Sequence, residues 1–299
     1  MNSVIVLNKP EGMTSFSACR RAASLLGEKK AGHAGTLDPN ASGVLIVCTG
    51  SSSRLIEYFP KDSKEYIAGI RFGMVSDTQD IWGEVIETCR PVFSSGDLEE
   101  VLRSFIGEIE QQTPAYSARK LNGRPFYEYA RKGVETQRPI RTVTIEQIEL
   151  ISADIPMEAE IRVRCSEGTY IRTLADDIGR KLGCGAVMSS LVRTKCCGYD
   201  ISQAHTLEEI SAAVSSGTAG DLLLSSDDPI RHLPKAVVSH SYEAMMLAGS
   251  KVPISGFTVS CGSIAEGGAV RLYAESGFSG IGIVTGNGIK PKKVMVDAK

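Results

Sequence analysis

The stretch that most constrains this chain runs from residue 32 to residue 50 and reads GHAGTLDPNASGVLIVCTG. Its second half, from Gly43 to Thr49, is an apolar run bounded by glycines, which predicts a buried strand. The first half is crowded with turn-forming residues, and Pro39 both lacks a backbone donor and disfavours helical geometry at Asp38. We therefore expect no regular structure in the first half. Asp38 would then lie on a stiff loop leading into a core strand, a position that suits a catalytic group.

Asp38 has two interpretations from these residues alone. An aspartate before a proline is a common turn initiator, whose side chain bonds the local backbone. The longer pattern favours the other interpretation, because GHxGTLDPxAxG followed by GVLxVxxG closely resembles the hallmark of the TruB family of tRNA pseudouridine synthases. In that family the aspartate is the catalytic nucleophile, and the resemblance assigns this role to Asp38.

Length and charge set the bounds for the rest of the chain. A chain of 299 residues predicts one large domain and one small one, and 42% hydrophobic with 23% charged residues is typical of a globular protein. The formal net charge is −2, so any nucleic-acid footprint must be local. The eight cysteines include no CxxC pair, so we expect reduced, buried thiols and no metal site. The sequence shows neither a signal peptide nor a membrane span, which predicts a cytoplasmic protein with no membrane partner.

The opening of the chain predicts a strand at 3–7, a turn, and a helix from Thr14 or Ser15 to about residue 26. The turn reads NKPxGxTS, an opening common in the same family, which places Lys9 among the substrate-binding residues. Without the resemblance, Lys9 is an ordinary turn lysine.

Tyr66 begins a segment, 64–72, that alternates as a strand does, and residues 73–83 follow as a long turn. A tyrosine in this position is usually half-buried packing. The segment resembles the family block KxYxxxxxxGxxTDTxDxxG, with Ser76 in place of the usual threonine. That resemblance places Tyr66 against the target base and lets its phenol help to remove the C5 proton.

Residues 113–141 carry the local positive charge, with seven basic residues against two acidic ones and four interleaved aromatic rings. Such a segment fits phosphate contacts and base stacking, but a solvated amphipathic helix has the same composition. The pattern PAYSAxKxxGxxxYExAR resembles the family insertion that clasps an RNA stem-loop.

Two strands are expected at 142–151 and 158–165, before a helix whose buried face is set by apolar residues at spacings of three and four. Arg172 lies off that face in the first turn, where it opposes the helix dipole and is usually tied to a carboxylate. The block GTYIRxLxxDxG resembles the family segment whose arginine pairs with the nucleophile and whose tyrosine lines the pocket, here Arg172 and Tyr170. A further strand at 186–195 resembles the family's LxRT segment, which places Leu191 against the uracil rather than only in the core.

The end of the chain predicts a short helix at 206–214, a linker, and a β-rich segment from about 235 that suits a small barrel. We therefore expect a catalytic domain at 1–232 and a PUA-like RNA-binding domain at 233–299. The family implies an α+β pseudouridine synthase fold, with a mixed, largely antiparallel central sheet flanked by helices.

The resemblance implies isomerisation of uridine to pseudouridine at position 55 in the T-loop of tRNA, by a monomer without cofactor or obligatory protein partner. The uridine must leave its stack, and His33 is expected to occupy the space that it vacates. The nucleophile must be ionised, which a nearby Arg172 favours. Two other functions remain open: an RNA-binding or folding factor without turnover, and the guide-RNA-dependent relative of archaea and eukaryotes, which lacks the basic insertion.

Overall fold

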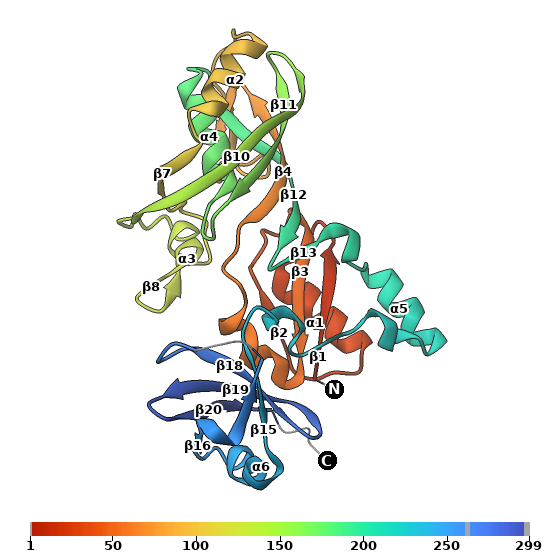
Figure 1. Ribbon diagram of the computed structural model, residues 1–299. Helices are drawn as coiled ribbons and strands as arrows, with labels where there is room; N and C mark the ends of the chain where they lie inside the picture. The colour runs from red at the N-terminus through yellow and green to blue at the C-terminus, as the bar shows by residue number, and fades with distance from the viewer. Residues whose placement is uncertain (1, 261–263, 296–299) are drawn as a thin grey trace. The chain divides into compact units, whose positions relative to one another are not determined.

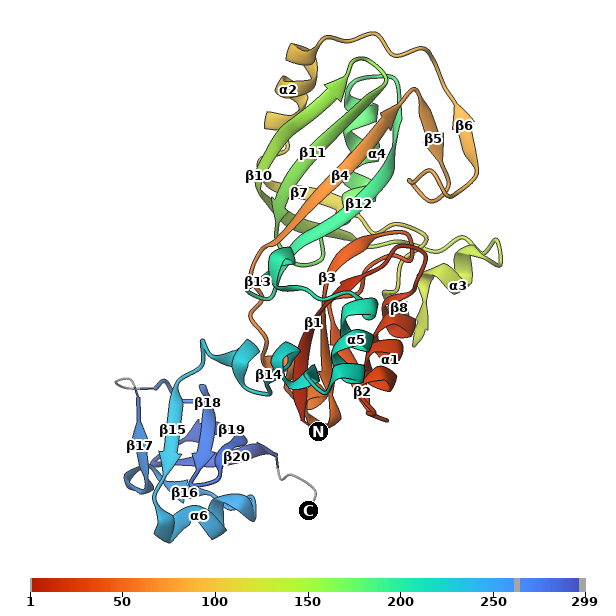
Figure 2. The ribbon, with the colours of Figure 1, turned by 90° about the vertical axis from the view of Figure 1, so that its right-hand side faces the viewer.

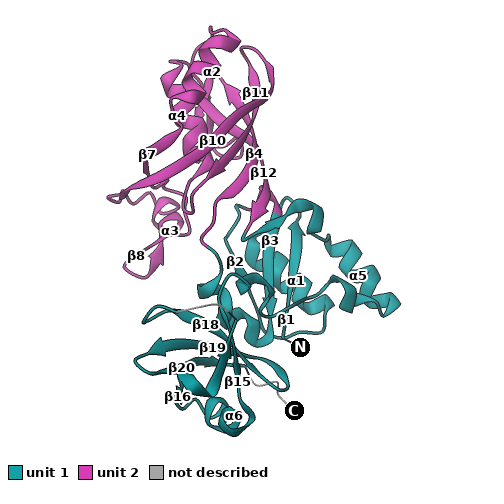
Figure 3. Ribbon diagram, viewed as in Figure 1, with its two compact units in different colours: residues 1–38, 44–60, 197–299 teal, residues 39–43, 61–196 magenta. Residues whose placement is uncertain are grey.

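The computed structural model describes residues 2–260 and 264–295 and divides into two compact units (Figure 3). Cys261 lies outside the described residues. The first unit comprises Met1–Asp38, Val44–Pro60 and Cys197–Lys299, and the second comprises Pro39–Gly43 and Lys61–Cys196. The division between the units falls at the candidate nucleophile, since Asp38 belongs to the first unit and Pro39 to the second.

The N-terminal part of the first unit is a small sheet covered by helices α1 and α5 (Figure 2). The sheet has the order β14-β1-β3, with β2 paired to β3, and its core combines apolar residues of β1 and β3 with those of both helices. The elements are β1 (Ser3–Lys9), α1 (Ser15–Leu25), β2 (Ala31–Ala34), β3 (Ser42–Thr49), the 3-10 helix η1 (Gly50–Tyr58), β13 (Tyr199–Asp200), η2 (Ile201–Gln203), α5 (Leu207–Ser216), η3 (Ala219–Leu222), β14 (Leu224–Ser225) and η4 (Asp228–Ile230).

Helix α1 begins and ends where its sequence predicts. Thr14 is the N-cap and accepts a hydrogen bond from the backbone N–H of Ser17, and Gly27 follows with a φ of 73°. The expectation of no regular structure after residue 32 is wrong for 32–34, because β2 pairs antiparallel with β3 and places His33 opposite Val47. The buried strand β3 supplies hydrogen-bond partners that the glycine-rich local sequence does not indicate.

The C-terminal part of the first unit is a six-stranded, barrel-like sheet with the order β16-β20-β19-β18-β15-β17 (Figure 1). Its interior is an apolar cluster that includes Val252, Val270 and Ile289. The predicted small C-terminal β-barrel is therefore confirmed. Its elements are β15 (Lys235–Val238), α6 (His240–Leu247), β16 (Val252–Pro253), η5 (Ile254–Gly256), β17 (Phe257–Val259), β18 (Ala269–Ala274), β19 (Gly277–Thr285) and β20 (Gly288–Val294).

The second unit is built on an antiparallel sheet with the order β12-β4-β11-β10-β7 (Figure 2). Helix α4 packs on β12 and β4, and α2 packs on α4 and β10. Ser42 and Gly43, which belong to this unit, pair parallel with Val192 and Arg193 of β12. The mixed, largely antiparallel sheet with flanking helices is thus confirmed. Its elements are β4 (Lys64–Phe72), α2 (Ser95–Arg103), β7 (Gly107–Gln112), β10 (Ile140–Asp154), β11 (Glu158–Cys165), α4 (Ile171–Lys181) and β12 (Ala186–Cys196).

Two short hairpins extend from the second unit. The first pairs β5 (Met74–Ser76) with β6 (Val85–Glu87), so the expectation of one long turn over 73–83 is wrong for its first residues. The second lies in the basic segment and consists of β8 (Lys120–Leu121) and β9 (Arg124–Pro125), followed by the short helix α3 (Phe126–Ala130). The amphipathic-helix alternative for 113–141 is therefore limited to five residues. None of the described helices is long and apolar enough to cross a membrane.

Candidate active site

Asp38 is half-buried and lies just after a backbone segment that a buried serine fixes. The Oγ of Ser15 donates to the carbonyl of Leu37 at 3.0 Å and accepts from its N–H at 2.8 Å. Ser15 is 2% exposed and is the first residue of α1, so this two-way contact ties the loop to the helix. With Leu37 held on one side and Pro39 restricting the other, the Asp38 backbone has little freedom. This agrees with the stiff loop expected from the sequence.

Lys9 and His33 lie on strands β1 and β2 of the first unit. Lys9 is fully buried at the end of β1, and its Nζ donates to the carbonyls of Pro10 at 2.7 Å and Met13 at 2.6 Å. These bonds tie down the turn that leads into α1. His33 is half-buried on β2, which corrects the expectation that it shares a loop with Asp38.

Tyr66, Leu191 and Arg193 share one face of the sheet in the second unit. Tyr66 on β4 lies directly opposite Arg193 on β12, and Leu191 lies opposite Ala68. Because side chains two residues apart on a strand point to the same side, Leu191 is the diagonal neighbour of Tyr66. All three side chains are buried, at 7% exposed or less. The structure therefore brings together two of the predicted binding residues and adds an arginine beside them.

The surroundings of the Tyr66 phenol act on its pKa in opposite directions. Burial raises its pKa to about 12, while Arg193 acts in the opposite direction through its charge and through a side-chain hydrogen bond. The thiols of Cys165 and Cys196 add smaller effects that raise the pKa. At neutral pH the side chain is a neutral phenol, with a guanidinium beside its oxygen.

Arg172 is held by several partners at the start of α4. It is 5% exposed, and its guanidinium donates to the carbonyl of Tyr116 at 2.8 Å and to that of Thr78 at 3.2 Å. The Nη1 atom of Arg172 is also 4.0 Å from the carboxylate of Asp80. The expectation that Arg172 is tied to a carboxylate is met within the second unit by Asp80. Its pairing with Asp38 stays a prediction, because the two residues belong to different units.

The turn that carries Asp80 is fastened on two sides. The side chain of Gln79 accepts from Thr173 at 2.9 Å and donates to Asp176 at 3.0 Å, which docks the turn on α4. Backbone bonds between Gln79, Ile81 and Met188 attach it to β12. The carboxylate of Asp80 accepts from the Thr78 hydroxyl at 2.6 Å. The negative charge near Arg172 is therefore fixed in position.

Tyr170 is positioned by a neighbouring strand. It is the N-cap residue of α4 but provides no side-chain cap. Instead, Gln111 on β7 accepts from its N–H at 3.0 Å and donates to its carbonyl at 3.2 Å. Gln111 is 2% exposed, so this contact anchors the helix start that carries both Tyr170 and Arg172.

The sequence predictions did not include Asp80, Gln111 and Arg193. Two of them carried a local signal. Arg193 lies two residues after Leu191 in a predicted strand and must share its face, and Asp80 is an aspartate of the family block that begins at Lys64. Gln111 acts through a contact with the start of α4 that is distant in sequence and has no local signature.

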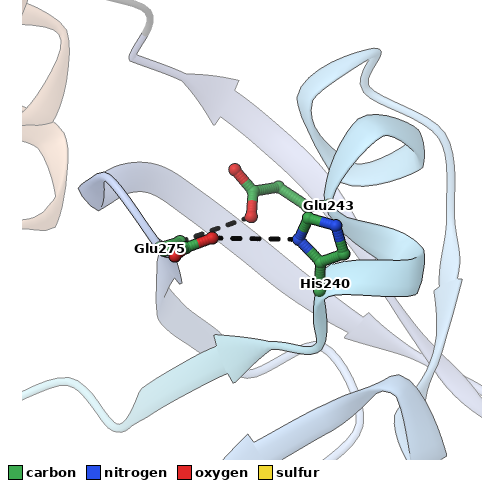
Figure 4. Close-up of side chains that lie close together, drawn as sticks. All are labelled: His240, Glu243 and Glu275. Atoms are coloured by element: carbon green, nitrogen blue, oxygen red, sulfur yellow. Dashed lines mark hydrogen bonds and ion pairs between the residues drawn. The ribbon is translucent and has the colours of Figure 1, made fainter.

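Among the residues the structure describes, one group has donor atoms close enough to hold a metal ion. His240, Glu243 and Glu275 have ligand atoms within 4.8 Å of one another, on α6 and the turn after β18 (Figure 4). The side chains of His240 and Glu275 are 93% and 84% exposed, and the Glu275 N–H donates to Glu243 at 3.4 Å. Such an exposed group is an ordinary surface cluster, and we assign no site to it.

The chain matches two family models along most of its length. The model of the TruB family pseudouridylate synthase N-terminal domain covers residues 23–171, and that of the tRNA pseudouridylate synthase B C-terminal domain covers 172–226. The tRNA pseudouridine synthase B of Alkaliphilus oremlandii is 41% identical over 95% of this chain and 93% of its own length. That of Bacillus subtilis is 39% identical over 93% of this chain and 91% of its own.

Solved structures show the same fold. A chain of a Cbf5-Nop10-Gar1 complex is 26% identical, with a TM-score of 0.74 over 98% of this chain and 84% of that chain. A chain of an H/ACA RNP bound to a substrate RNA containing 2'-deoxyuridine has the same TM-score and coverage of this chain, at 24% identity. The sequence identity to the curated relatives and the two family models together show that this chain belongs to the TruB family of pseudouridylate synthases, enzymes that convert uridine to pseudouridine.

Proposed function

We propose that this chain isomerises uridine to pseudouridine at position 55 in the T-loop of tRNA, with Asp38 as nucleophile and no cofactor. The observation that carries the proposal is the restricted backbone of Asp38, which lies between the Ser15–Leu37 contact and Pro39 in a chain of this family. The reaction breaks the C–N glycosidic bond, turns the uracil and joins its C5 atom to the ribose. The carboxylate either attacks the uracil, attacks the ribose or assists a glycal route.

The nucleophile must carry a negative charge, and Arg172 is the residue that we assign to favour it. An aspartate has an unperturbed pKa of about 3.9, and an adjacent guanidinium favours the ionised form. Arg172 suits this role because it is buried and oriented by backbone carbonyls, so its charge is fixed. We propose an ion pair between Arg172 and Asp38, in addition to the contact of the same guanidinium with Asp80 at 4.0 Å.

The binding residues support a single flipped-out uridine. Extrusion of a base costs a few kcal/mol, and stacking on one aromatic ring returns about 1–3 kcal/mol. We assign Tyr66 as the stacking ring, Leu191 and Tyr170 as walls of the pocket, and His33 as the residue that fills the vacated position. We also assign Lys9 to substrate binding, at the turn before α1 that its bonds to Pro10 and Met13 fix.

The remaining assignments concern RNA and the arrangement of the chain. We propose that the basic segment 113–141 and the domain at 233–299 bind the tRNA, while residues 1–232 carry the chemistry. The barrel-like sheet lies wholly within 233–299, which supports this boundary. We propose a cytoplasmic monomer that needs no partner protein. Activity on bare tRNA separates such an enzyme from the guide-RNA-dependent relatives.

The test is pseudouridine formation in an unmodified tRNA transcript incubated with the purified protein alone. We expect product at position 55, and none when that uridine is replaced by cytidine. Asp38→Asn should abolish product while RNA affinity stays within a few fold, because the amide keeps the shape but is not a nucleophile. Asp62→Asn, a change at an exposed residue outside the site, is the matched control.

Three results would argue against the proposal. Binding of tRNA without turnover by the wild type would identify an RNA-binding factor. Product that appears only with added partner proteins would indicate a guide-dependent enzyme. Turnover retained in Asp38→Asn would remove the nucleophile assignment.

A further inference from the structure

Arg193 is the largest fully buried side chain of the described residues, with 1% of its surface exposed. Taking a guanidinium out of water costs several kcal/mol unless it is paired and hydrogen-bonded. A charged residue in such a position therefore calls for a reason beyond packing.

The position of Arg193 is fixed by the strands on both sides. On one side it pairs across the sheet with Tyr66, and on the other it pairs with Gly43. Gly43 has a φ of 102°, and a Cβ atom there would lie 2.2 Å from the carbonyl oxygen of Arg193. Only a glycine permits this approach of the two backbones. The register of β12 at Arg193 is thereby set.

The contact with Tyr66 has a defined direction. A guanidinium has donors and no acceptor, so in the hydrogen bond between the two side chains the phenol oxygen accepts. The phenol proton must therefore point elsewhere, and the oxygen faces a fixed positive charge. The other titratable groups that act on this phenol are the thiols of Cys165 on β11 and Cys196 on β12, and both oppose its ionisation. Arg193 is the neighbour that favours the phenolate.

We propose that Arg193 is a positioning residue for Tyr66, holding the phenol oxygen so that it accepts the proton from C5 of the rearranged uracil. The inference rests on the proposed function and deepens it, because it assigns the last proton transfer to a pair of side chains within the second unit. Arg193 does not need to touch the substrate for this role.

The proton transfer follows the formation of the new C–C bond. Once C5 has joined the ribose, C5 carries both the new C–C bond and its original hydrogen. The minor ionised form of the phenol takes that proton, and the electron pair of the C5–H bond becomes the C5=C6 double bond. On the ribose and glycal routes the C6=N1 pair moves to N1, which takes a proton from solvent. On the uracil route the bond between C6 and the Asp38 carboxylate breaks instead, and its electron pair returns to the carboxylate. The neutral phenol then returns its proton to solvent. Arg193 stabilises the ionised phenol before the transfer, through a charge-assisted hydrogen bond.

The test is the single-turnover rate on an RNA stem-loop carrying either uridine or 5-deuterated uridine at the target position. Arg193→Met keeps the volume but removes the charge and the donors. We expect it to lower the rate about 10- to 100-fold, part of the loss typical for a general base. RNA affinity should stay within a few fold, and the deuterium isotope effect should rise, because C5–H cleavage becomes slower. Arg193→Lys, which keeps a charged donor, should recover part of the rate.

A double-mutant comparison separates positioning from general support of the fold. In a Tyr66→Phe background there is no phenol oxygen to position, so Arg193→Met should cause no further loss of rate. An equal loss in both backgrounds, or an isotope effect unchanged from the wild type, would overturn the inference. If Arg193→Met does not fold, the same comparison with Arg193→Lys decides the question.

Different results would contradict the proposed function and the role of Arg193. Absence of product with the wild type, or full activity of Asp38→Asn, would contradict the proposed function whatever Arg193 does. Normal activity and a clear loss in Asp38→Asn, together with additive effects of the changes at Arg193 and Tyr66, would leave the function intact and remove only this inference.

Discussion

Replacing Ser15 with alanine tests how Asp38 is held. The substitution removes one hydroxyl, which both donates to the carbonyl of Leu37 and accepts from its N–H. It leaves helix α1 otherwise intact, since alanine is a good helix former. Leu37 is 4% exposed, so both of its backbone groups lose their partner away from solvent.

The magnitude follows from those two groups. A buried backbone group left without a partner costs about 1–3 kcal/mol, so the two together predict a destabilisation of about 2–6 kcal/mol. Water that enters the space of the lost hydroxyl would place the result in the lower half of that range. The loop would also lose its anchor one residue before Asp38. A reacting group displaced by about 1 Å can lose about 100-fold in rate, so we expect a rate loss of about 10- to 100-fold.

The assay combines urea unfolding with single-turnover kinetics on the tRNA transcript. Ser17→Ala is the matched control, because Ser17 is exposed two residues along the same helix. RNA affinity should change little in either variant, since neither residue belongs to the basic segment. If Ser15→Ala is as stable and as active as Ser17→Ala, the contact between Ser15 and Leu37 does not hold the nucleophile in place.

Two further predictions concern helix α4. Gln111→Leu should lower the single-turnover rate more than RNA affinity, because it removes both bonds to the Tyr170 backbone at the start of the helix. Gln112→Leu, at the exposed neighbouring position, should leave the rate and the affinity unchanged. Burial, followed by repulsion from Asp176, raises the pKa of Asp177 to about 6, above its unfolded value near 4. A group with a raised pKa contributes stability below the unfolded pKa, and this is lost as the pH rises through the folded pKa. The free energy of unfolding should therefore fall between about pH 4 and pH 6 by roughly 1 kcal/mol, after discounting for solvent screening. Asp177→Asn should flatten this part of the stability profile. A profile unchanged in Asp177→Asn would contradict the raised pKa of Asp177.

Sequence patterns predicted the elements whose periodicity is strong. The strand at 64–72 matches β4 at both ends, and its residues are buried at every second position from Tyr66 to Phe72. The helix after Gly168 was found from one apolar face, and α4 buries that face at Ile171, Leu174 and Ile178. In both elements, the local pattern and the packing favour the same structure.

The elements that were missed depend on pairing with distant residues. Strand β2 has a short sequence rich in small residues and forms because β3 offers it a hydrogen-bonding edge. The hairpin of β5 and β6 has β6 exposed at each position, so no buried alternation marks it. Strand pairing across several residues carries little local signal, and a single sequence does not show it.

The residues of the candidate site divide in the same way, into those marked by a local pattern and those placed by distant contacts. The family pattern named Asp38, Tyr66 and Arg172, and the structure gives each of them a fixed environment within its own unit. Lys9 was expected in an ordinary turn or at the substrate, yet the structure buries it and points its ammonium at two backbone carbonyls. Arg193 could have been placed beside Leu191 by strand alternation, but its partner Tyr66 follows only from the register of β4 and β12.

The most direct test of the account is a crystal structure of the protein bound to a T-stem-loop RNA. The account predicts that a carboxylate oxygen of Asp38 lies within about 4 Å of the Arg172 guanidinium, the reach of an ion pair, and beside a uridine flipped out onto the ring of Tyr66. A structure with a flipped uridine and the Asp38 carboxylate turned away from both groups would contradict the central claim.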